Sequence, residues 1–200
     1  MTGPDGGWDA SYQRSEPPPW DIGHPQPVFA ALARDGRLRG DLLDAGCGTG
    51  EHSLLAAACG AVVHGVDLSG VAVDRARQKA AERGLSISFE AGDILSASLP
   101  VAGFDVAIDS GLFHSFDDKD RARYVDVIAR ALRPGGTFFL MCFSDRQPGD
   151  WGPRRVTKAE LRDAFSRGWT VLSIEPAIFE INPFADASSV QAWFGTFRRD

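Results

Sequence analysis

The sequence predicts an α/β fold with a mostly parallel sheet of seven strands, helices on both faces and an antiparallel hairpin at the C-terminal end. Three observations lead to this prediction. Apolar runs alternate with helical patterns from residue 28 to residue 166, which is typical of a parallel sheet. The run 137–143 is uninterrupted and apolar, as expected of a strand covered on both faces. The last two strand-like runs have no helix between them, which indicates a hairpin.

The predicted elements follow from local patterns. Strands are expected at 42–44, 62–67, 86–90, 104–109, 137–143, 170–181 and 190–198, and helices at 28–34, after Gly50, and at 71–83, 118–133 and 158–166. Ser69 is a suitable N-cap for the helix 71–83, and Gly84 ends that helix. The prolyl-glycyl-glycine at 134–136 ends the helix 118–133, and a proline-containing turn joins the hairpin strands.

Composition limits the class of protein. The chain has 200 residues, of which 44% are apolar and 24% charged, so one globular domain is expected. Three cysteines without a C-x-x-C pair predict neither a disulfide framework nor a metal site, and they favour a reducing, cytoplasmic location. No apolar run approaches the roughly 20 residues of a membrane span, and the N-terminus does not resemble a signal peptide. The net charge of −6 disfavours nucleic acid as a partner.

The first 27 residues differ from the rest and are treated as an arm that precedes a domain at 28–200. They hold half of the twelve prolines, and we expect no regular helix or strand there. Such a segment can be a disordered tail. Disordered tails tend to lack large apolar groups, however, whereas this one carries Trp8, Tyr12, Trp20 and Ile22. We therefore expect the arm to fold over another part of the molecule.

A glycine-rich loop follows the first strand of the predicted sheet. Gly46, Gly48 and Gly50 alternate there, and glycine allows a sharp turn and a close approach of backbone to a ligand. The dinucleotide fingerprint G-x-G-x-x-G needs its third glycine one position later, where Glu51 stands. An acidic residue at a helix N-terminus also opposes pyrophosphate. The loop therefore predicts a site for a nucleoside without phosphates.

An acidic residue ends the second strand and supports the same prediction. Asp67 lies at about the 20-residue offset from the first strand at which a carboxylate binds ribose hydroxyls in such folds. A glycine turn or an acid at a strand end is weak evidence alone. Because the two occur in order on consecutive strand–helix units, they indicate a nucleoside site.

These segments resemble the motifs of the class I S-adenosylmethionine (SAM) dependent methyltransferases, whose fold is Rossmann-like. Asp44 with its three glycines resembles motif I. The segments 66–69, 91–94, 104–109 and 132–136 resemble the ribose-binding turn, the adenine-binding turn, the motif IV strand and the turn before the fifth strand. As an ordered set these motifs are specific, and they cover residues 42–143.

The resemblance implies SAM as the cofactor and a role for each matching residue. The implied cofactor-binding residues are Trp20, Asp44, Gly46, Cys47, Gly48, Gly50, Asp67, Leu68, Asp93, Ile94, Asp109 and Ser110. Asp44 would hold the methionyl ammonium, and Asp67 the ribose hydroxyls. Leu68 would pack on the adenine, whose edge Asp93 and Ile94 would contact. An alternative role for Asp93 is to cap the turn before Leu95.

The segment 109–115 is expected at the reaction centre, where the strand order reverses. Asp109 and His114 are the candidate catalytic residues, with His114 as general base for a hydroxyl or thiol acceptor. His114 could instead simply pack against neighbouring phenylalanines. His24 is a second candidate base, whereas the two other histidines, His52 and His64, are interpreted as structural.

The arm resembles the start of small-molecule methyltransferases grouped with the thiopurine, halide/thiol and mycobacterial heterocyclic-toxin enzymes. In that group the arm covers the cofactor and closes the acceptor pocket. An indole face favours a sulfonium cation, so Trp20 is the candidate to pack on it; the alternative is that Trp20 packs in the core. The loop 144–156 is a further lid candidate, and its Arg154 and Arg155 either attract an anionic acceptor or face solvent.

We therefore predict a methyltransferase acting on a hydroxyl, thiol or ring nitrogen of a small aromatic or heterocyclic molecule. A nicotinamide-dependent oxidoreductase is one alternative, weakened by the early third glycine and by the lack of a Tyr-x-x-x-Lys motif. A non-catalytic SAM-binding sensor is the other. Alignment of the reactants can drive methyl transfer without a diagnostic catalytic residue, so the sequence does not separate a methyltransferase from a sensor.

Overall fold

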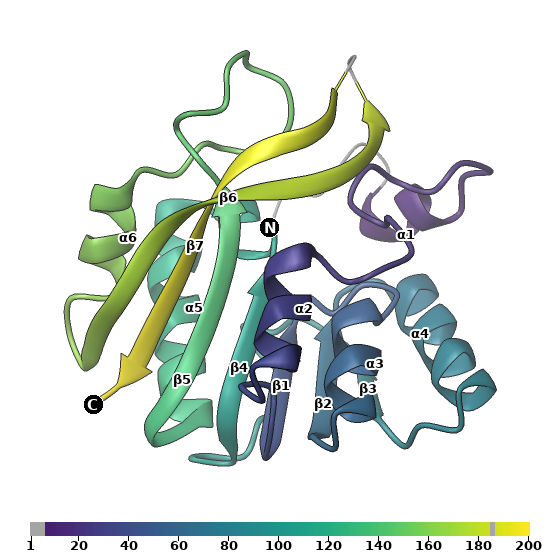
Figure 1. Ribbon diagram of the computed structural model, residues 1–200, viewed down its shortest axis with the longest axis horizontal. Coiled ribbons are helices and arrows are strands. Elements are labelled where there is room, and N and C mark those ends of the chain that lie inside the picture. The colour runs from purple at the N-terminus through teal and green to yellow at the C-terminus, as the bar shows by residue number, and fades with distance from the viewer. Residues whose placement is uncertain (1–6, 185–186) are drawn as a thin grey trace.

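A single sheet of seven strands organises the protein, in the order β3-β2-β1-β4-β5-β7-β6 (Figure 1). The structure is a computed structural model that describes residues 7–184 and 187–200. The strands are β1 (Asp41–Ala45), β2 (Val62–Asp67), β3 (Ser88–Ala91), β4 (Phe104–Ser110), β5 (Leu132–Phe143), β6 (Trp169–Phe184) and β7 (Ala187–Arg199). Strands β1 to β5 pair in parallel, whereas β7 runs antiparallel to both β5 and β6. The predicted Rossmann-like sheet with its antiparallel hairpin is thus confirmed.

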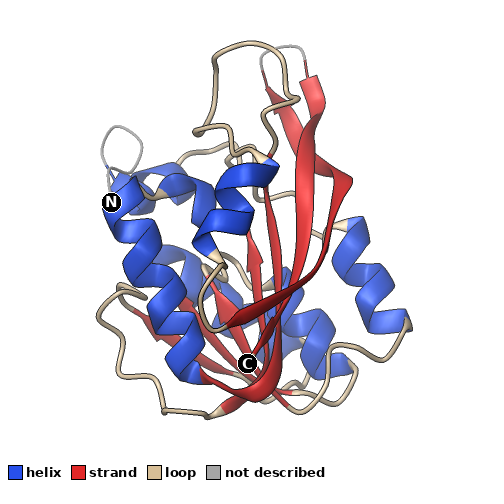
Figure 2. Cartoon of the chain, turned by 90° about the vertical axis from the view of Figure 1, so that its left-hand side faces the viewer, coloured by secondary structure: helices blue, strands red, loops and turns tan. Residues whose placement is uncertain are grey.

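Helices cover both faces of the sheet (Figure 2). They are α1 (Gly7–Tyr12), α2 (Pro27–Arg34), α3 (Glu51–Ala58), α4 (Gly70–Glu82), α5 (Asp118–Ala131) and α6 (Lys158–Ala164), with a short 3-10 turn at Phe113–Ser115. One core cluster joins α5 and α6 to β4 and β5, and a second joins α2 and α3 to the opposite face. Aromatic rings fill much of the first cluster, where Phe165 stacks on Phe197 with the ring centres 3.9 Å apart. None of the described helices is long and apolar enough to cross a membrane.

Local signals set most element boundaries. The Ser69 hydroxyl accepts from the backbone N–H of Ala72 at 3.1 Å, so it caps α4 as predicted. The prediction for the end of α5 was wrong by two residues, because the helix ends at Ala131 and β5 already begins at Leu132. The residues 134–136 lie in a stretch where the pairing of β5 with β4 shifts register. The tip of the hairpin, residues 185–186, lies outside the described residues.

The arm contains a helix that the sequence did not predict. The six-residue helix α1 lies over α4 in Figure 1, and its last residue, Tyr12, is buried. A helix this short has too little intrinsic stability to form alone, so it depends on the surface that it covers. The expectation of an arm without regular structure was therefore wrong for Gly7–Tyr12.

Candidate active site

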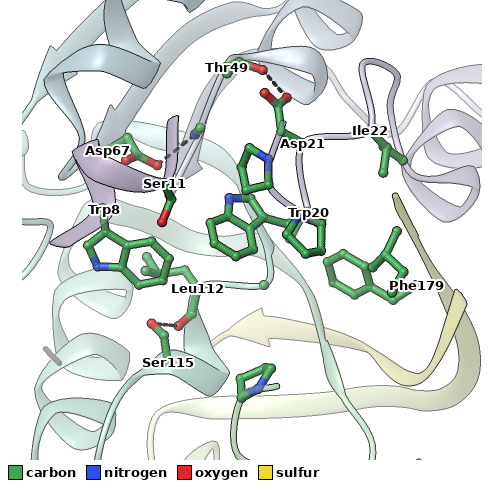
Figure 3. Close-up of a pocket in the computed structure, with 18 of the residues that line it drawn as sticks. Trp8, Ser11, Trp20, Asp21, Ile22, Thr49, Asp67, Leu112, Ser115 and Phe179 are labelled. Carbon is green, nitrogen blue, oxygen red and sulfur yellow. Dashed lines mark hydrogen bonds between the residues drawn. The ribbon is translucent and has the colours of Figure 1, made fainter. Parts of the chain in front are cut away.

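A cavity of about 970 Å³ opens at the carboxyl ends of β1, β2 and β4, where the strand order reverses. Its walls come from the arm, the glycine loop, the segment after β4, the loop 144–156 and the upper part of β6 (Figure 3). This volume is near the upper end of the usual range for small-molecule sites, which is about 300 to 1,000 Å³. The cavity therefore has room for two ligands side by side.

The glycine loop and Asp67 form one wall. The Asp67 carboxylate accepts from the backbone N–H of Gly48 and from that of Ser69, both at 2.8 Å. Gly46 and Gly50 have φ values of 74° and 88°, a backbone conformation that favours glycine. Burial raises the pKa of Asp67, while the two backbone donors act in the opposite direction. The carboxylate is thus held in place by backbone and lies on the cavity wall.

Asp44 lies beneath the glycine loop rather than on the cavity wall. It is 1% exposed, and its carboxylate accepts from the Ser53 hydroxyl at 2.6 Å. Burial raises its pKa to about 7, with the charge of Asp67 adding to the effect. Asp44 therefore carries a proton more readily than an ordinary carboxyl group does.

The arm brings three aromatic side chains to the cavity. The Trp20 indole donates to the Tyr12 hydroxyl at 2.9 Å and meets Trp8 edge to face, with ring centres 5.6 Å apart. Figure 3 shows Trp20 between Asp67 and Phe179 in the view into the cavity. Trp20 keeps 38% of its surface exposed, so it presents a broad apolar face to a ligand.

Hydrogen bonds attach the arm to three separate parts of the domain. Asp21 accepts from the hydroxyl of Thr49 in the glycine loop at 2.6 Å (Figure 3), and Asp9 accepts from the hydroxyl of Ser69 at 2.6 Å.

The side-chain amide of Asn182 on β6 donates to the carbonyls of Pro18 and Asp21. The side chain of Gln26 exchanges two hydrogen bonds with the backbone of Glu180, both at 2.8 Å. The arm thus spans the cavity mouth from α4 to the hairpin.

Asp109 supports the segment after β4 instead of facing the cavity. Its two carboxylate oxygens accept from the backbone N–H groups of Leu112 and Phe113 and from the Tyr124 hydroxyl, at 2.7, 3.0 and 2.8 Å. The residue is fully buried, and burial raises its pKa to about 7. These contacts give Asp109 the role of positioning the loop that carries His114.

His114 lies on the cavity wall with a fixed orientation. Its Nδ1 accepts from the backbone N–H of Phe143 at 3.0 Å, and its ring meets the Phe143 ring at 4.9 Å. A neutral imidazole has one N–H and one acceptor nitrogen, so this bond puts the proton on Nε2. Burial lowers the pKa of His114 to about 3, with Arg121 and Arg155 contributing. The ring is therefore neutral at physiological pH.

Aromatic side chains from distant segments line the region next to His114. Phe143 meets Phe179 at 5.8 Å and Trp151 at 6.5 Å, and Trp151 meets Phe184 at 5.7 Å. Sequence reasoning named the loop 144–156, which carries Trp151, as a lid candidate, but it did not identify the contacts among these four rings. The long apolar run of β6 gave no indication of which residues its face covers.

The structure brings most of the predicted site residues together. Ten lie on the cavity wall: Trp20, Gly46, Cys47, Gly48, Gly50, Asp67, Leu68, Ile94, Ser110 and His114. Asp44, Asp93 and Asp109 do not lie on that wall. The Asp93 carboxylate accepts from the backbone N–H of Leu95 at 3.0 Å, which is the capping role considered as an alternative. Roles in cofactor binding remain predictions for all of these residues.

The three other histidines have different surroundings. His52 is partly buried, and its Nε2 accepts from the backbone N–H of Gln26 at 3.1 Å, so it supports the arm. His64 contacts Ser88 and Glu90 on β3. His24 lies on the cavity wall, with 57% of its side chain exposed and Glu180 3.7 Å away.

Comparison with known proteins identifies the family. Residues 42–136 match a family described as a methyltransferase domain. The chain is 36% identical over 197 residues to 2-heptyl-1-hydroxyquinolin-4(1H)-one methyltransferase of Mycobacteroides abscessus, covering 96% of this chain and 86% of the relative. The chain belongs to the SAM-dependent methyltransferases.

Two further likenesses extend over nearly the whole methyltransferase. Probable thiol methyltransferase 2 of Arabidopsis thaliana is 28% identical, with 94% of this chain and 84% of the relative covered. A structure solved for the conversion of a disulfide bond into a thioacetal group during echinomycin biosynthesis is 39% identical. It superposes with a TM-score of 0.83 and covers 92% of this chain and 86% of that one. The nicotinamide-dependent oxidoreductase and the sensor are not favoured by these relatives.

The cavity fits SAM, which is the cofactor of this methyltransferase. Leu68 keeps 44% of its surface exposed, and with Trp20 it offers apolar surface to a flat base. Among the described residues, nothing accepts from the buried indole N–H of Trp8, so a donor is left for a ligand. Asp67 adds a carboxylate on the wall for hydroxyl or ammonium groups.

Proposed function

We propose that this methyltransferase transfers the methyl group of SAM to a hydroxyl, thiol or ring nitrogen of a small aromatic or heterocyclic molecule. The observation that carries the proposal is the continuity of the cavity. One end holds the glycine loop and Asp67, and the other holds His114 with the rings of Phe143 and Phe179. A flat aromatic acceptor matches such a wall, because aromatic rings gain from edge-to-face and offset contacts with one another.

The chain's contribution to catalysis is alignment and exclusion of water. SAM supplies a methyl carbon on a sulfonium, which needs a nucleophile in line with the carbon–sulfur bond. The glycine loop and Asp67 would fix the cofactor end, while Phe143, Trp151 and Phe179 would hold the acceptor ring. Holding two reactants in a productive geometry is worth about 7 to 11 kcal/mol of the barrier in favourable cases.

The relatives support an acceptor of this class. One is named for a hydroxyquinolinone and another for a thiol, and both match almost the whole chain. The arm, the loop 144–156 and the hairpin contribute to the cavity wall, which suits a small acceptor better than a macromolecule.

We further propose that residues 1–27 are a lid that closes over bound SAM; the first six of them lie outside the described residues. The contacts of Asp9, Asp21 and Gln26 support this role, because they join the arm to both sides of the cavity. Trp20 would then lie against the sulfonium, where a cation–π contact contributes about 0.5 to 2 kcal/mol.

Titration calorimetry followed by an activity screen tests the function. SAM and S-adenosylhomocysteine should bind at micromolar concentration and NAD should not. The protein should then transfer radiolabelled methyl groups to at least one of a set of phenols, aromatic thiols, hydroxyquinolines and ring-nitrogen heterocycles. SAM binding without transfer to any of them would contradict the proposed acceptor class, and tighter binding of NAD would contradict the cofactor assignment.

We also infer that the enzyme works in a reducing compartment, the cytoplasm. Cys47, Cys59 and Cys142 are all free, and Cys59 is exposed. Fractionation of cells that express the protein tests this location, and recovery outside the cytoplasm would contradict it.

A further inference from the structure

The hydrogen bond between Phe143 and His114 determines which nitrogen of His114 a ligand can meet. Nδ1 accepts from the backbone N–H of Phe143, a group that cannot give up its proton. Among residues 7–184 and 187–200, no hydrogen bond to Nε2 is present, and His114 lines the cavity. The atom left for the acceptor is therefore Nε2, which carries the proton of the neutral ring.

We propose that His114 donates a hydrogen bond from Nε2 to the acceptor, and that the enzyme takes its acceptor as the anion of an acidic hydroxyl or thiol. This inference rests on the proposed methyl transfer and narrows its substrate class. It replaces the earlier expectation that His114 is a general base, because a base needs a free lone pair directed at the acceptor.

The surroundings of His114 favour an anion. Two charged groups act on the ring, Arg121 from α5 and Arg155 from the loop 144–156, and both are positive. The sides formed by β5 and β6 present the rings of Phe143 and Phe179. Asp109 on β4 is occupied by its own three hydrogen bonds. A second proton on His114 would break the bond to Phe143 and bury a cation beside two others.

Three more charged groups near His114, namely Asp117, Arg154 and Glu160, have partners of their own. Asp117, at the start of α5, accepts from the backbone N–H of Asp120 at 2.8 Å. Glu160 lies 3.6 Å from Arg121 and also pairs with Arg154. One neutral N–H donor, with two guanidinium groups acting on its ring and aromatic rings beside it, stabilises a bound anion and gives no help in removing a proton.

The proposed reaction is balanced without a base on the protein. The acceptor loses its proton to water before it binds. A lone pair on its oxygen or sulfur then forms a bond to the methyl carbon while the carbon–sulfur bond breaks, and that electron pair stays on the sulfur. The negative acceptor and the positive sulfonium become two neutral products. The hydrogen bond from His114 holds the reacting atom in line and limits the choice to acceptors that ionise near neutral pH.

The tautomer of His114 can be measured without any acceptor. Nitrogen-15 NMR spectra of the wild type, with the His114 signals assigned by their absence in His114→Gln, report which ring nitrogen carries the proton. We expect the Nε2–H form throughout pH 5 to 9, both with and without S-adenosylhomocysteine. An Nδ1–H form, or titration of this ring within that range, would overturn the proposal.

Two variants separate a donor from a base. The side-chain amide of His114→Gln supplies an N–H near the position of Nε2 but is no base, whereas His114→Phe keeps an aromatic ring and supplies no donor. We expect the glutamine variant to keep at least a fifth of wild-type kcat/KM and the phenylalanine variant to lose about 100-fold, the usual cost of removing a donor to an anion. Equal losses of 100-fold or more in both variants would support a base and overturn the proposal.

The pH profile gives an independent reading. With a series of substituted thiophenols, the acidic limb of the kcat/KM profile should move with the pKa of each thiol. For any one thiol, the limb should lie at the same pH in His114→Gln as in the wild type. A limb fixed at one pH for all acceptors would indicate a group on the enzyme and contradict the proposal. Failure of the wild type to methylate any acceptor would instead contradict the proposed function, and the NMR spectrum would still decide the role of His114.

Discussion

The guanidinium of Arg155 donates to the backbone carbonyl of Trp151 at 2.8 Å and lies 5.9 Å from the centre of the Trp151 ring. The same group donates to the carbonyls of Gln147, Gly149 and Pro153. Sequence reasoning expected Arg155 to attract an anionic acceptor or to face solvent, and it did not predict these hydrogen bonds to the backbone of its own loop. Arg155 thereby fixes the wall that carries Trp151.

Substitution of Arg155 should affect the acceptor and leave the cofactor alone. In Arg155→Met the loop loses several charge-assisted hydrogen bonds, so Trp151 no longer has a fixed position. We expect the acceptor KM to rise about tenfold, equivalent to about 1.4 kcal/mol, while the Kd of SAM stays within twofold. Steady-state kinetics and calorimetry measure the two quantities. Arg162→Met, an exposed change on α6, is the matched control, and an equal rise in the Kd of SAM would contradict the assignment.

Loss of the Asn182 side chain should loosen the arm. Asn182→Ala removes two hydrogen bonds to the arm but keeps the backbone bond from Asn182 to Pro19 at 2.8 Å. At about 1 kcal/mol for each of the two hydrogen bonds, limited trypsin digestion after Arg14 should become roughly thirtyfold faster, and SAM should dissociate faster. Mass spectrometry of the fragments and stopped-flow release measure these rates. Ser189→Ala on β7 is the control, and rates equal to wild type would show that the arm does not depend on Asn182.

Asp44 should make the free energy of unfolding fall as pH rises from about 4 to about 7. Its pKa is raised to about 7 in the folded protein, whereas an unfolded aspartate titrates near 3.9. Between these values the folded state holds a proton that the unfolded chain has lost, which costs at most about 1.4 kcal/mol per pH unit. Burial also raises the pKa of Asp109 to about 7, so Asp109 contributes to the same fall in the free energy of unfolding.

Asp44→Asn should remove the share of this pH dependence that belongs to Asp44. From pH 5 to pH 7, urea unfolding should show the variant gaining up to about 2 to 3 kcal/mol relative to wild type. Asp126→Asn, an exposed change on α5, should run parallel to wild type. Parallel curves for Asp44→Asn and wild type would mean that Asp44 is ionised in the folded protein already at pH 5.

Gly46→Ala should be more damaging than Gly60→Ala. Both positions have positive φ values, 74° and 90°, so backbone strain destabilises both variants by about 1 to 2 kcal/mol. A Cβ on Gly60 meets open space, whereas one on Gly46 would stand 2.9 Å from the Cβ of Leu112. We expect a larger fall in Tm for Gly46→Ala and weaker SAM binding as well. Equal Tm values for the two variants would show that the segment after β4 moves aside freely.

The parallel part of the fold could be predicted from sequence because its signals are local. The bounds of β2 matched at both ends, and Ser69 caps α4 as expected. The helix α1 could not be predicted, since six residues carry no helical period and contacts with α4 hold them. Likewise, nothing in the helical pattern of α5 indicates that the helix ends at Ala131 and that β5 begins at Leu132.

The cofactor end of the site was predictable for the same reason, because its residues follow consecutive strands. At the acceptor end the sequence indicated the segment 109–115 and the loop 144–156, but not the aromatic contacts between them and the hairpin. Phe143, Trp151 and Phe179 come from three segments that meet only in the folded chain. The role of His114 depends on one backbone N–H of β5, and no spacing in the sequence reveals that contact.

The hydrogen bonds between Asn182 and the arm join segments 161 to 164 residues apart in the chain. The arm leaves the ribosome well before the strand that anchors it, β6. Contacts so distant in sequence form late, after the sheet has organised the chain between them. Cofactor retention by a nascent or truncated chain would therefore report that β6 has been synthesised and has joined the sheet.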